Sequence, residues 1–419
     1  MKTFASGIVV ALLAGQQAAP PPHAIRFRDV TRDVTADSGI RFSHRSAHTP
    51  DKFLIETMGS GLAWLDYDGD GLADLFLLNG ARIARSGSRT TIDKSDPSHW
   101  NRLYRNLGGD KFADVTEATG LRGSTFAMGV AAGDIDNDGW PDLYITGWER
   151  NTLYRNEGGK KFVEITARAG VNPGGWSAGA AFLDYDRDGL ADLFVARYLD
   201  WSFDNNPWCG PREPDRRGYC HPNSFGDVRH VLYRNLGDGR FEDVSRKSGI
   251  ADYPGKGLGI AIADIDQDGW IDILVANDSV AQQVFRNNGG RTFADIALES
   301  GLAYSADGKP FAGMGIDVAD YDNDGQPEVF INALSLEGYA LFRSSGSGVF
   351  DSVSEESGLR RASDPFGGWG ARFADFDNEW VEGSVRGART RNGHDPSAQP
   401  EALLPPAPAA DAQRGGEAR

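Results

Sequence analysis

The sequence predicts an all-β protein, a β-propeller of four-stranded blades with five complete units and an incomplete sixth. Three features that recur in a fixed order along the 419 residues carry this prediction: an acidic loop, the tetrapeptide LYRN or a variant, and the pentapeptide F-x-D-V-T or a variant. Each unit supplies a Gly- and Ala-rich strand A before the loop, an apolar strand B after it, strand C at LYRN and strand D at F-x-D-V-T. Four-stranded units repeated at this spacing are typical of propeller blades.

The acidic loop occurs five times in full and once in part. It reads DYDGDGLAD from 66, DIDNDGWPD from 134, DYDRDGLAD from 184, DIDQDGWID from 264 and DYDNDGQPE from 320, and it breaks off as DFDN at 375. Three alternating carboxylates, a Gly for a sharp turn and a fourth carboxylate at position 9 predict an all-oxygen cage for a hard cation. The size and flexibility of such a cage favour Ca²⁺ over Mg²⁺, so we expect about five Ca²⁺ ions.

The predicted ligands occupy the same places in every loop. Positions 1, 3, 5 and 9 supply the carboxylates of Asp66, Asp68, Asp70, Asp74, Asp134, Asp136, Asp138, Asp142, Asp184, Asp186, Asp188, Asp192, Asp264, Asp266, Asp268, Asp272, Asp320, Asp322, Asp324 and Glu328. Position 7 supplies the backbone carbonyls of Leu72, Trp140, Leu190, Trp270 and Gln326.

Two other interpretations of the loops are weaker. An EF-hand shares the D-x-D-x-D-G start but needs a bidentate Glu at position 12 and a helix on each side. Position 12 is apolar in every copy and lies in strand-like runs such as DLFLLNG and DLYITG. An acidic surface turn explains one copy, but it does not explain five copies with the same fourth carboxylate.

The remaining strands follow each loop at regular places. Strand C lies at 103–106, 153–156, 232–235, 284–287 and 341–344, and strand D begins at Phe112, Phe162, Phe241, Phe293 and Phe350. Strand A is rich in small residues because the innermost strands crowd the propeller axis, where only Gly or Ala allows close backbone approach. We expect the indoles of Trp140 and Trp270 to pack between blades.

Two long inserts, at 80–100 and 198–229, interrupt the connection from strand B to strand C in the first and third units. In a four-stranded blade these connections lie on the face opposite the acidic loops, and loops on a rigid scaffold often carry function. Met58, Phe126, Trp176 and Lys256 enter strand A on this face and form a candidate partner face around the axial opening. The plainer interpretation is that Phe126 and Trp176 pack between blades.

The two cysteines, Cys209 and Cys220, both lie in the second insert. In an oxidising compartment two cysteines in one surface loop are expected to form a disulfide, which would stabilise that loop by about 2 to 3 kcal/mol. The alternative is a metal site with His221 and His230, but no second ligand cluster at zinc-finger spacing accompanies them.

Charge and hydropathy bound the function and the location. The net charge of −17 argues against nucleic acid as a partner, because nucleic acid requires clustered Lys and Arg. Residues 1–20 are predicted to be a secretory signal peptide, since Lys2 precedes an apolar stretch at 4–15 that is too short to span a bilayer. With no other apolar stretch of spanning length, we expect an exported protein, either periplasmic, cell-surface or secreted, without a transmembrane segment.

We place the propeller at 25–378 and a disordered tail, rich in Ala, Pro, Arg and Gly, at 379–419. The pattern stops inside the sixth loop after Asp375 and Asp377, for which a frameshift or gene truncation is one explanation and an in-frame tail the other. Residues 27–31, FRDVT, match strand D without a preceding A, B or C. This segment is therefore predicted to complete the last blade and to close the ring.

Several of these motifs resemble those of a known family. GVAAGDIDNDGWPDL at 129–143 resembles an FG-GAP (VCBS-type) repeat. The wider pattern, with FSH at 42, ETMGSG at 56, the loops and L-Y-R-N-x-G, is similar to the ASPIC/UnbV-domain family, the bacterial relatives of cartilage acidic protein. The resemblance covers about residues 25–378 and implies an extracytoplasmic calcium-binding propeller. It implies little about a ligand, because fold analogy is weak support for function.

Two functional hypotheses from different classes follow. The first is a secreted, calcium-stabilised binding or adhesion module for a protein or glycan partner. The alternative is an extracytoplasmic enzyme, for example one acting on polysaccharide, that uses the face of the inserts. No H-E-x-x-H or P-loop motif is present, and no catalytic residue is assigned. A basic, aromatic-lined cleft between the inserts would favour the enzyme, and a flat, continuous face would favour binding.

Overall fold

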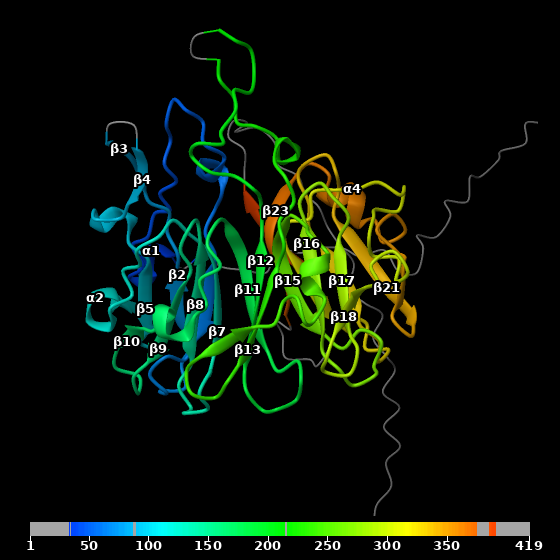
Figure 1. Ribbon diagram of the computed structural model, residues 1–419, viewed down its shortest axis with the longest axis horizontal. Helices are drawn as coiled ribbons and strands as arrows, with labels where there is room; N and C mark the ends of the chain where they lie inside the picture. Colours follow the sequence, from blue (N-terminus) through cyan, green and yellow to red (C-terminus); the bar gives the residue numbers. More distant parts are fainter. Residues whose placement is uncertain (1–32, 34, 87–88, 214–215, 375–384, 391–419) are drawn as a thin grey trace, which may run out of the picture.

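Five four-stranded antiparallel sheets make up most of the protein in the computed structural model (Figure 1), which describes residues 33, 35–86, 89–213, 216–374 and 385–390. Within each sheet the strands lie in the order A, B, C, D along the chain, as predicted. Blade 1 holds β1 (Leu62–Leu65), β2 (Asp74–Leu77), β5 (Arg102–Asn106) and β6 (Phe112–Asp114). Blade 2 holds β7 (Ala127–Gly133), β8 (Asp142–Gly147), β9 (Thr152–Asn156) and β10 (Phe162–Glu164).

The other three complete blades repeat this arrangement. Blade 3 holds β11 (Ser177–Leu183), β12 (Asp192–Arg197), β13 (Val231–Asn235) and β14 (Phe241–Asp243). Blade 4 holds β15 (Gly257–Ala263), β16 (Asp272–Asn277), β17 (Gln283–Asn287) and β18 (Phe293–Asp295). Blade 5 holds β19 (Ile316–Ala319), β20 (Glu328–Ile331), β21 (Ala340–Gly346) and β22 (Val349–Ser352).

The register of the first two strands places each acidic loop at the end of a hairpin. In blade 2, for example, Gly133 pairs with Asp142, so the last residue before the loop lies opposite the position 9 carboxylate. The same pairing joins Leu65 to Asp74 and Ala319 to Glu328. Because strand B begins at position 9, the hairpin itself brings the fourth carboxylate back beside position 1.

Glycines in strand A let neighbouring blades approach closely. A Cβ added to Gly129 would lie 2.3 Å from the carbonyl oxygen of Ala178 in the next blade, a distance that real Cβ atoms do not show. A Cβ on Gly179, Gly259 or Gly315, at the same register in blades 3, 4 and 5, would likewise come closer than 3.0 Å to the next blade, and a Cβ on Gly61 of blade 1 would lie 3.1 Å from the carbonyl oxygen of Met128. The crowding predicted for strand A is therefore present along the whole row.

The sixth unit contains two paired strands, β23 (Gly367–Phe373) and β24 (Val385–Thr390). The second strand lies in the segment that was predicted to be disordered. Its sequence lacks the alternation of apolar and polar residues that predicts a strand, but its backbone pairs with the open edge of β23. Where blade 1 faces away from blade 2, Leu62 and Trp64 are 53% and 56% exposed. The predicted closing segment 27–31, the signal peptide and the partial loop at 375–378 lie outside the described residues.

Short helices and one hairpin complete the described structure. The helical turns are α1 (Thr35–Ser38), η1 (Leu54–Thr57), η2 (Pro97–His99), α2 (Thr116–Thr119), α3 (Thr166–Ala169), η3 (Pro222–Ser224), η4 (Ile250–Asp252) and α4 (Leu359–Ser363). None of these helices is long and apolar enough to cross a membrane. The first insert forms the hairpin of β3 (Arg82–Ser86) and β4 (Arg89–Asp93).

The two inserts project from the same side of the molecule. In Figure 1 the hairpin β3–β4 lies at the upper end of the view, and the green segment of the second insert extends beyond it at that end. We call this side the insert face and the side of the acidic loops the loop face. Four apolar clusters lie between neighbouring blades, and a fifth, which includes Phe53, Trp176 and Trp201, lies beneath the inserts.

Candidate metal centres

Each acidic loop is folded by hydrogen bonds from its own backbone, as the loop of blade 2 illustrates. Asp134 Oδ1 accepts from the backbone N–H of Asp138 at 3.1 Å, and Asp134 Oδ2 accepts from that of Gly139 at 2.8 Å. The turn requires left-handed backbone at Asn137 (φ 55°) and at Gly139 (φ 88°). Gly at position 6 adopts this conformation without a steric cost, which explains its presence in all five loops.

The position 9 carboxylate is the most constrained residue of each site. Asp142 is completely buried, and it accepts from the backbone N–H groups of Ile135 at 3.0 Å and Asn156 at 2.7 Å. Burial raises the pKa of Asp142, Asp192 and Asp272 to about 7 and the pKa of Glu328 to about 8. Burial raises the pKa of Asp74 as well. A divalent cation beside these carboxyl groups would favour their charged form.

The structure brings the predicted ligands of each loop together. Three carboxyl groups per loop offer oxygens that lie within 4.8 Å of one another. The groups are Asp66, Asp68 and Asp70; Asp134, Asp136 and Asp142; Asp184, Asp186 and Asp192; Asp264, Asp266 and Asp268; and Asp320, Asp322 and Glu328. Positions 1 and 3 belong to every group, whereas the third member is position 5 in two loops and position 9 in three.

Several of these oxygens lack a hydrogen-bond partner among the described residues. They are Oδ1 of Asp68, Asp136 and Asp186, at position 3 of the first three loops, and Oε1 of Glu328. Each is buried, and a buried carboxylate oxygen without a partner is costly. The donor set is all oxygen, which suits a hard cation such as Ca²⁺. The residues therefore fit a metal ion.

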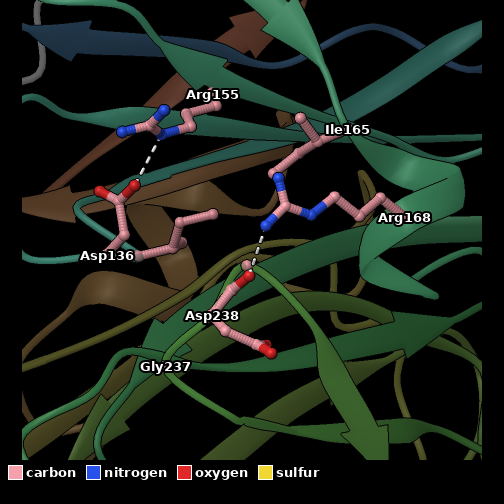
Figure 2. Close-up of a pocket in the computed structure, with 8 residues that line it drawn as sticks. Asp136, Arg155, Ile165, Arg168, Gly237 and Asp238 are labelled. Atoms are coloured by element: carbon pink, nitrogen blue, oxygen red, sulfur yellow. Dashed lines mark hydrogen bonds and ion pairs between the residues drawn. The ribbon is translucent and has the colours of Figure 1, made fainter.

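An arginine from strand C pairs with the acidic loop in blades 1, 2, 3 and 5, a feature that sequence reasoning missed. Arg155 Nε lies 2.6 Å from Asp136 Oδ2 (Figure 2). Arg155 also donates through a second nitrogen to Asp138 Oδ2 at 2.9 Å. Arg105 and Arg234 make the same two contacts in blades 1 and 3. In blade 5 Arg343 approaches Asp322 only to 3.6 Å. The recurrent Arg of LYRN was the available signal.

An asparagine from the same tetrapeptide joins neighbouring blades. Asn156 donates through Nδ2 to the backbone oxygen of Tyr67, which is position 2 of the preceding loop, at 2.9 Å. Asn235 and Asn287 donate to Ile135 and Tyr185 in the same way. Blade 5 carries Ser344 at this position, and its hydroxyl accepts from Gly346 instead. The acidic loops of the first four blades are therefore linked in a chain that does not extend to blade 5 through this contact.

The side chains at position 7 lie between successive loops, as expected for the two tryptophans. The Trp140 ring lies against Gly69 of the preceding loop. The Arg187 guanidinium of the preceding loop lies over the Trp270 ring, 4.2 Å from its centroid. Among the other position 7 residues, Gln326 contacts Gln267 of the preceding loop at 3.4 Å.

A small pocket of about 240 Å³ opens beside the second acidic loop, between blades 2 and 3. Figure 2 shows Arg155 directed toward Asp136 on one side of it, and Arg168 directed toward Asp238 on the other. Arg168 donates to the backbone oxygen of Asp238 at 2.8 Å. Both guanidinium groups thus have partners within the protein, and the pocket shares Asp136 with the candidate metal centre of blade 2.

The candidate partner face proposed from the sequence is wrong. Met58, Phe126 and Trp176 are buried in the cluster beneath the inserts, with Phe126 and Trp176 fully inaccessible. Lys256 is 3% exposed, and its Nζ donates to Asn223 Oδ1 at 2.9 Å. The inserts and residues 53–58 cover the end of the axis, so these four side chains pack inside the protein. For Phe126 and Trp176 this agrees with the alternative prediction that they have a packing role.

The predicted disulfide between Cys209 and Cys220 is present, with the two Cα atoms 5.2 Å apart. The alternative metal site with the histidines is therefore excluded. His221 accepts through Nδ1 from the backbone N–H of Asn223, and buried His230 accepts through Nδ1 from that of Arg197. The second insert is also tied to residues 51–56, because Tyr219 donates to Glu56 at 2.9 Å.

Comparison with known proteins gives a family. The FG-GAP-like repeat matches at residues 66–145, 134–195, 224–275 and 264–331, together more than half of the chain. Cartilage acidic protein 1 is 33% identical over 157 residues in Xenopus tropicalis and 31% in Homo sapiens. Both alignments cover 36% of this chain and 23% of the relative, so the chain matches about a quarter of the length of these relatives.

Two solved structures share a distant likeness. One is an Agrocybe aegerita lectin described as recognising non-reducing terminal N-acetylglucosamine, with a TM-score of 0.37 and 18% identity over 70% of this chain and 66% of the lectin. The other is the Vibrio cholerae biofilm matrix protein Bap1, with a TM-score of 0.37 and 16% identity over 69% of this chain and 38% of Bap1. At these TM-scores the likeness carries no conclusion about this chain.

Proposed function

Because the chain belongs to the FG-GAP-like repeat family, we propose that it is an exported, calcium-binding β-propeller that acts as a binding or adhesion module for a protein or glycan. One observation carries the proposal. In all five acidic loops carboxylate oxygens lie close together, and four carboxylate oxygens of these loops are buried without a partner among the described residues. A cation supplies the missing partner at each such place.

Calcium has a structural role in this proposal. The predicted ligands at positions 1, 3, 5 and 9, with the backbone carbonyl at position 7, would hold about five Ca²⁺ ions. Bound Ca²⁺ supplies positive charge that offsets the repulsion between carboxylates. In Asp136, Oδ2 already faces Arg155, whereas Oδ1 remains available for the ion. The affinity should lie in the weak extracellular range, on the order of 10⁻⁴ to 10⁻³ M.

The disulfide supports export, because disulfides persist mainly in oxidising compartments outside the cytosol. Export also suits weak calcium sites, since calcium is plentiful outside the cell. The signal peptide at 1–20 would provide the route, and it lies outside the described residues. Periplasmic, cell-surface and secreted locations all satisfy these observations.

The enzyme alternative rests on the cleft between the inserts. That cleft is lined by the aromatic rings of Trp148 and Phe203, but the cations Arg89 and Arg150 are matched by the anions Glu149 and Asp204. A cleft that is both aromatic and basic would favour an enzyme. This cleft is aromatic, but its charges are balanced. The lining of the cleft therefore favours the binding proposal.

The proposal predicts that removal of calcium destabilises the whole propeller. Chelation with EDTA should lower the melting temperature, and added Ca²⁺ should restore it by preferential binding to the folded state. Differential scanning calorimetry of the full chain in EDTA, in Ca²⁺ and in the same concentration of Mg²⁺ measures this. Magnesium should restore much less than calcium does. An identical melting curve in EDTA and Ca²⁺ would rule out the structural role.

A further inference from the structure

A groove of about 800 Å³ lies on the insert face above blade 2. Its position follows from loop lengths: in blade 2 only residues 148–151 connect strand B to strand C, whereas the neighbouring blades carry the inserts 80–100 and 198–229. β4 of the first insert forms one wall, and residues 202–204 of the second insert form the other. The short turn of blade 2, with residues 124–125, forms the floor.

The apolar part of the groove is supported from below. The rings of Trp148 and Phe203 lie edge to face with their centroids 4.6 Å apart. Both rings also contact Trp201, which is buried, and Phe203 contacts buried Phe53. Because this support comes from the cluster beneath the inserts, the two partly exposed rings are held in place. The Trp148 indole nitrogen is itself buried and has no acceptor among the described residues, so the ring presents its carbon edge and face, and not its N–H, to the groove.

The polar part of the groove offers hydroxyl groups and balanced charges. Thr90, Thr91, Ser124 and Ser202 line it together with two arginines and two carboxylates. Arg150 pairs with Glu164 outside the groove at 2.5 Å. Arg89 and Asp204, on opposite walls, are exposed and make no ion pair within the described part of the chain. Planar groups of this kind can each form two hydrogen bonds with a ligand.

The backbone of blade 2 presents two residues to the groove at once. Glu149 adopts a left-handed conformation (φ 63°), which is uncommon for a residue other than Gly, and its N–H donates to the backbone oxygen of Gly175 at 2.6 Å. Trp148 and Arg150, on either side of it, both line the groove. The tight turn therefore places a ring beside a guanidinium group.

We propose that this groove binds a neutral oligosaccharide. This proposal rests on the proposed function as a binding module and names the class of ligand. A sugar ring has an apolar face that stacks on an aromatic ring and hydroxyl groups that bond to planar polar side chains. The charge balance disfavours a polyanion, and the hydroxyl and charged side chains disfavour an apolar helix. An extended peptide added to the free edge of β4 is the competing occupant.

The test is binding of the full chain, at saturating Ca²⁺, to an array of short neutral oligosaccharides of glucose, galactose, mannose and N-acetylhexosamines. Trp148→Ala should weaken binding of the best sugar by about tenfold, since it removes a stacking surface. Arg89→Ala and Asp204→Ala change exposed side chains without described ion-pair partners, so they should weaken binding and leave the melting temperature unchanged. Trp64→Ala is the matched control, because Trp64 is exposed but lies outside the groove.

Sugar binding that is lost in the groove variants and kept in Trp64→Ala supports the proposal. A chain that melts in a calcium-dependent way but binds no oligosaccharide on the array would overturn the proposal that the groove binds sugar and leave the calcium proposal standing. Selection of a displayed peptide whose binding is lost in the same variants, with no sugar bound, would also overturn it. Sugar binding by a chain whose melting ignores Ca²⁺ would support the groove and overturn the calcium proposal instead.

Discussion

The loop face and the insert face are built on different principles. On the loop face the same short contacts recur in successive blades: carboxylates face a strand C arginine, and an asparagine joins the preceding loop. On the insert face the contacts occur once each and join distant segments, as between Glu56 and Tyr219. One face depends on charge balance, and the other depends on apolar packing and a disulfide. Different perturbations should therefore break each face.

The largest effect of a single substitution is expected at a position 9 carboxylate. Asp142→Ala removes a ligand and leaves the buried backbone N–H groups of Ile135 and Asn156 without their acceptor. We expect a loss of about 4 kcal/mol in the free energy of unfolding. Denaturant unfolding in Ca²⁺ measures it, with Asp252→Ala, an exposed Asp outside the loops, as the control. A loss equal to that of the control would refute the role given to position 9.

Acid should act on the root of the second insert. Burial lowers the pKa of His230 from 6.5 to about 4, so the unfolded chain takes up a proton at this residue before the folded chain does. Stability contributed by the neutral His230 is therefore present above pH 6.5 and is lost as the pH falls toward 4. The loss should reach about 2 kcal/mol at pH 5.

The measurement is the slope of unfolding free energy against pH between 6.5 and 4. The glutamine in His230→Gln does not titrate in this range. The slope for this variant should therefore be shallower than that of the natural chain, by the amount that uptake of one proton on unfolding contributes. Arg197 and Gln283, which contact His230, are unchanged in this variant. Parallel slopes would show that His230 does not govern the acid sensitivity of this region.

The smallest effects are expected from the asparagine that joins the blades. Asn156→Ala should cost about 1.5 kcal/mol, because the backbone oxygen of Tyr67 loses its donor. Ser344→Asn introduces the equivalent side chain in blade 5 and should stabilise the chain by about 0.5 to 1 kcal/mol. Hydrogen exchange should show the first change at the junction of blades 1 and 2 and the second at the junction of blades 4 and 5. Destabilisation by Ser344→Asn would argue against the interblade contact as a general feature.

The loop face was largely predictable, because short sequence motifs that recur in every blade encode it. Loop position 9, strand B and the small residues of strand A follow from spacing alone, and the structure has them where they were expected. The strand C arginine was missed because its partner, Asp136, is distant in sequence, although the Arg recurs in every unit. Alternation within a strand says on which face a side chain lies, but it does not name the group that it contacts.

The insert face was not predictable beyond its disulfide. The burial of Met58 and Lys256 depends on how residues 53–58 and the second insert fold over the axis, and neither segment repeats elsewhere in the chain. The groove has the same origin, because Trp148 and Phe203 belong to different blades. Only the relative lengths of the connections were visible in the sequence, and they locate the walls of the groove without naming what lines it.

The central claim, that the acidic loops are calcium sites, is tested most directly by counting bound ions. Calcium-free full-length chain, titrated by calorimetry and checked by equilibrium dialysis, should bind about five Ca²⁺ ions. Asp136→Ala should bind about one fewer, since it removes one ligand from one loop. Binding of no calcium, or the same number of ions in the variant as in the natural chain, would contradict the account.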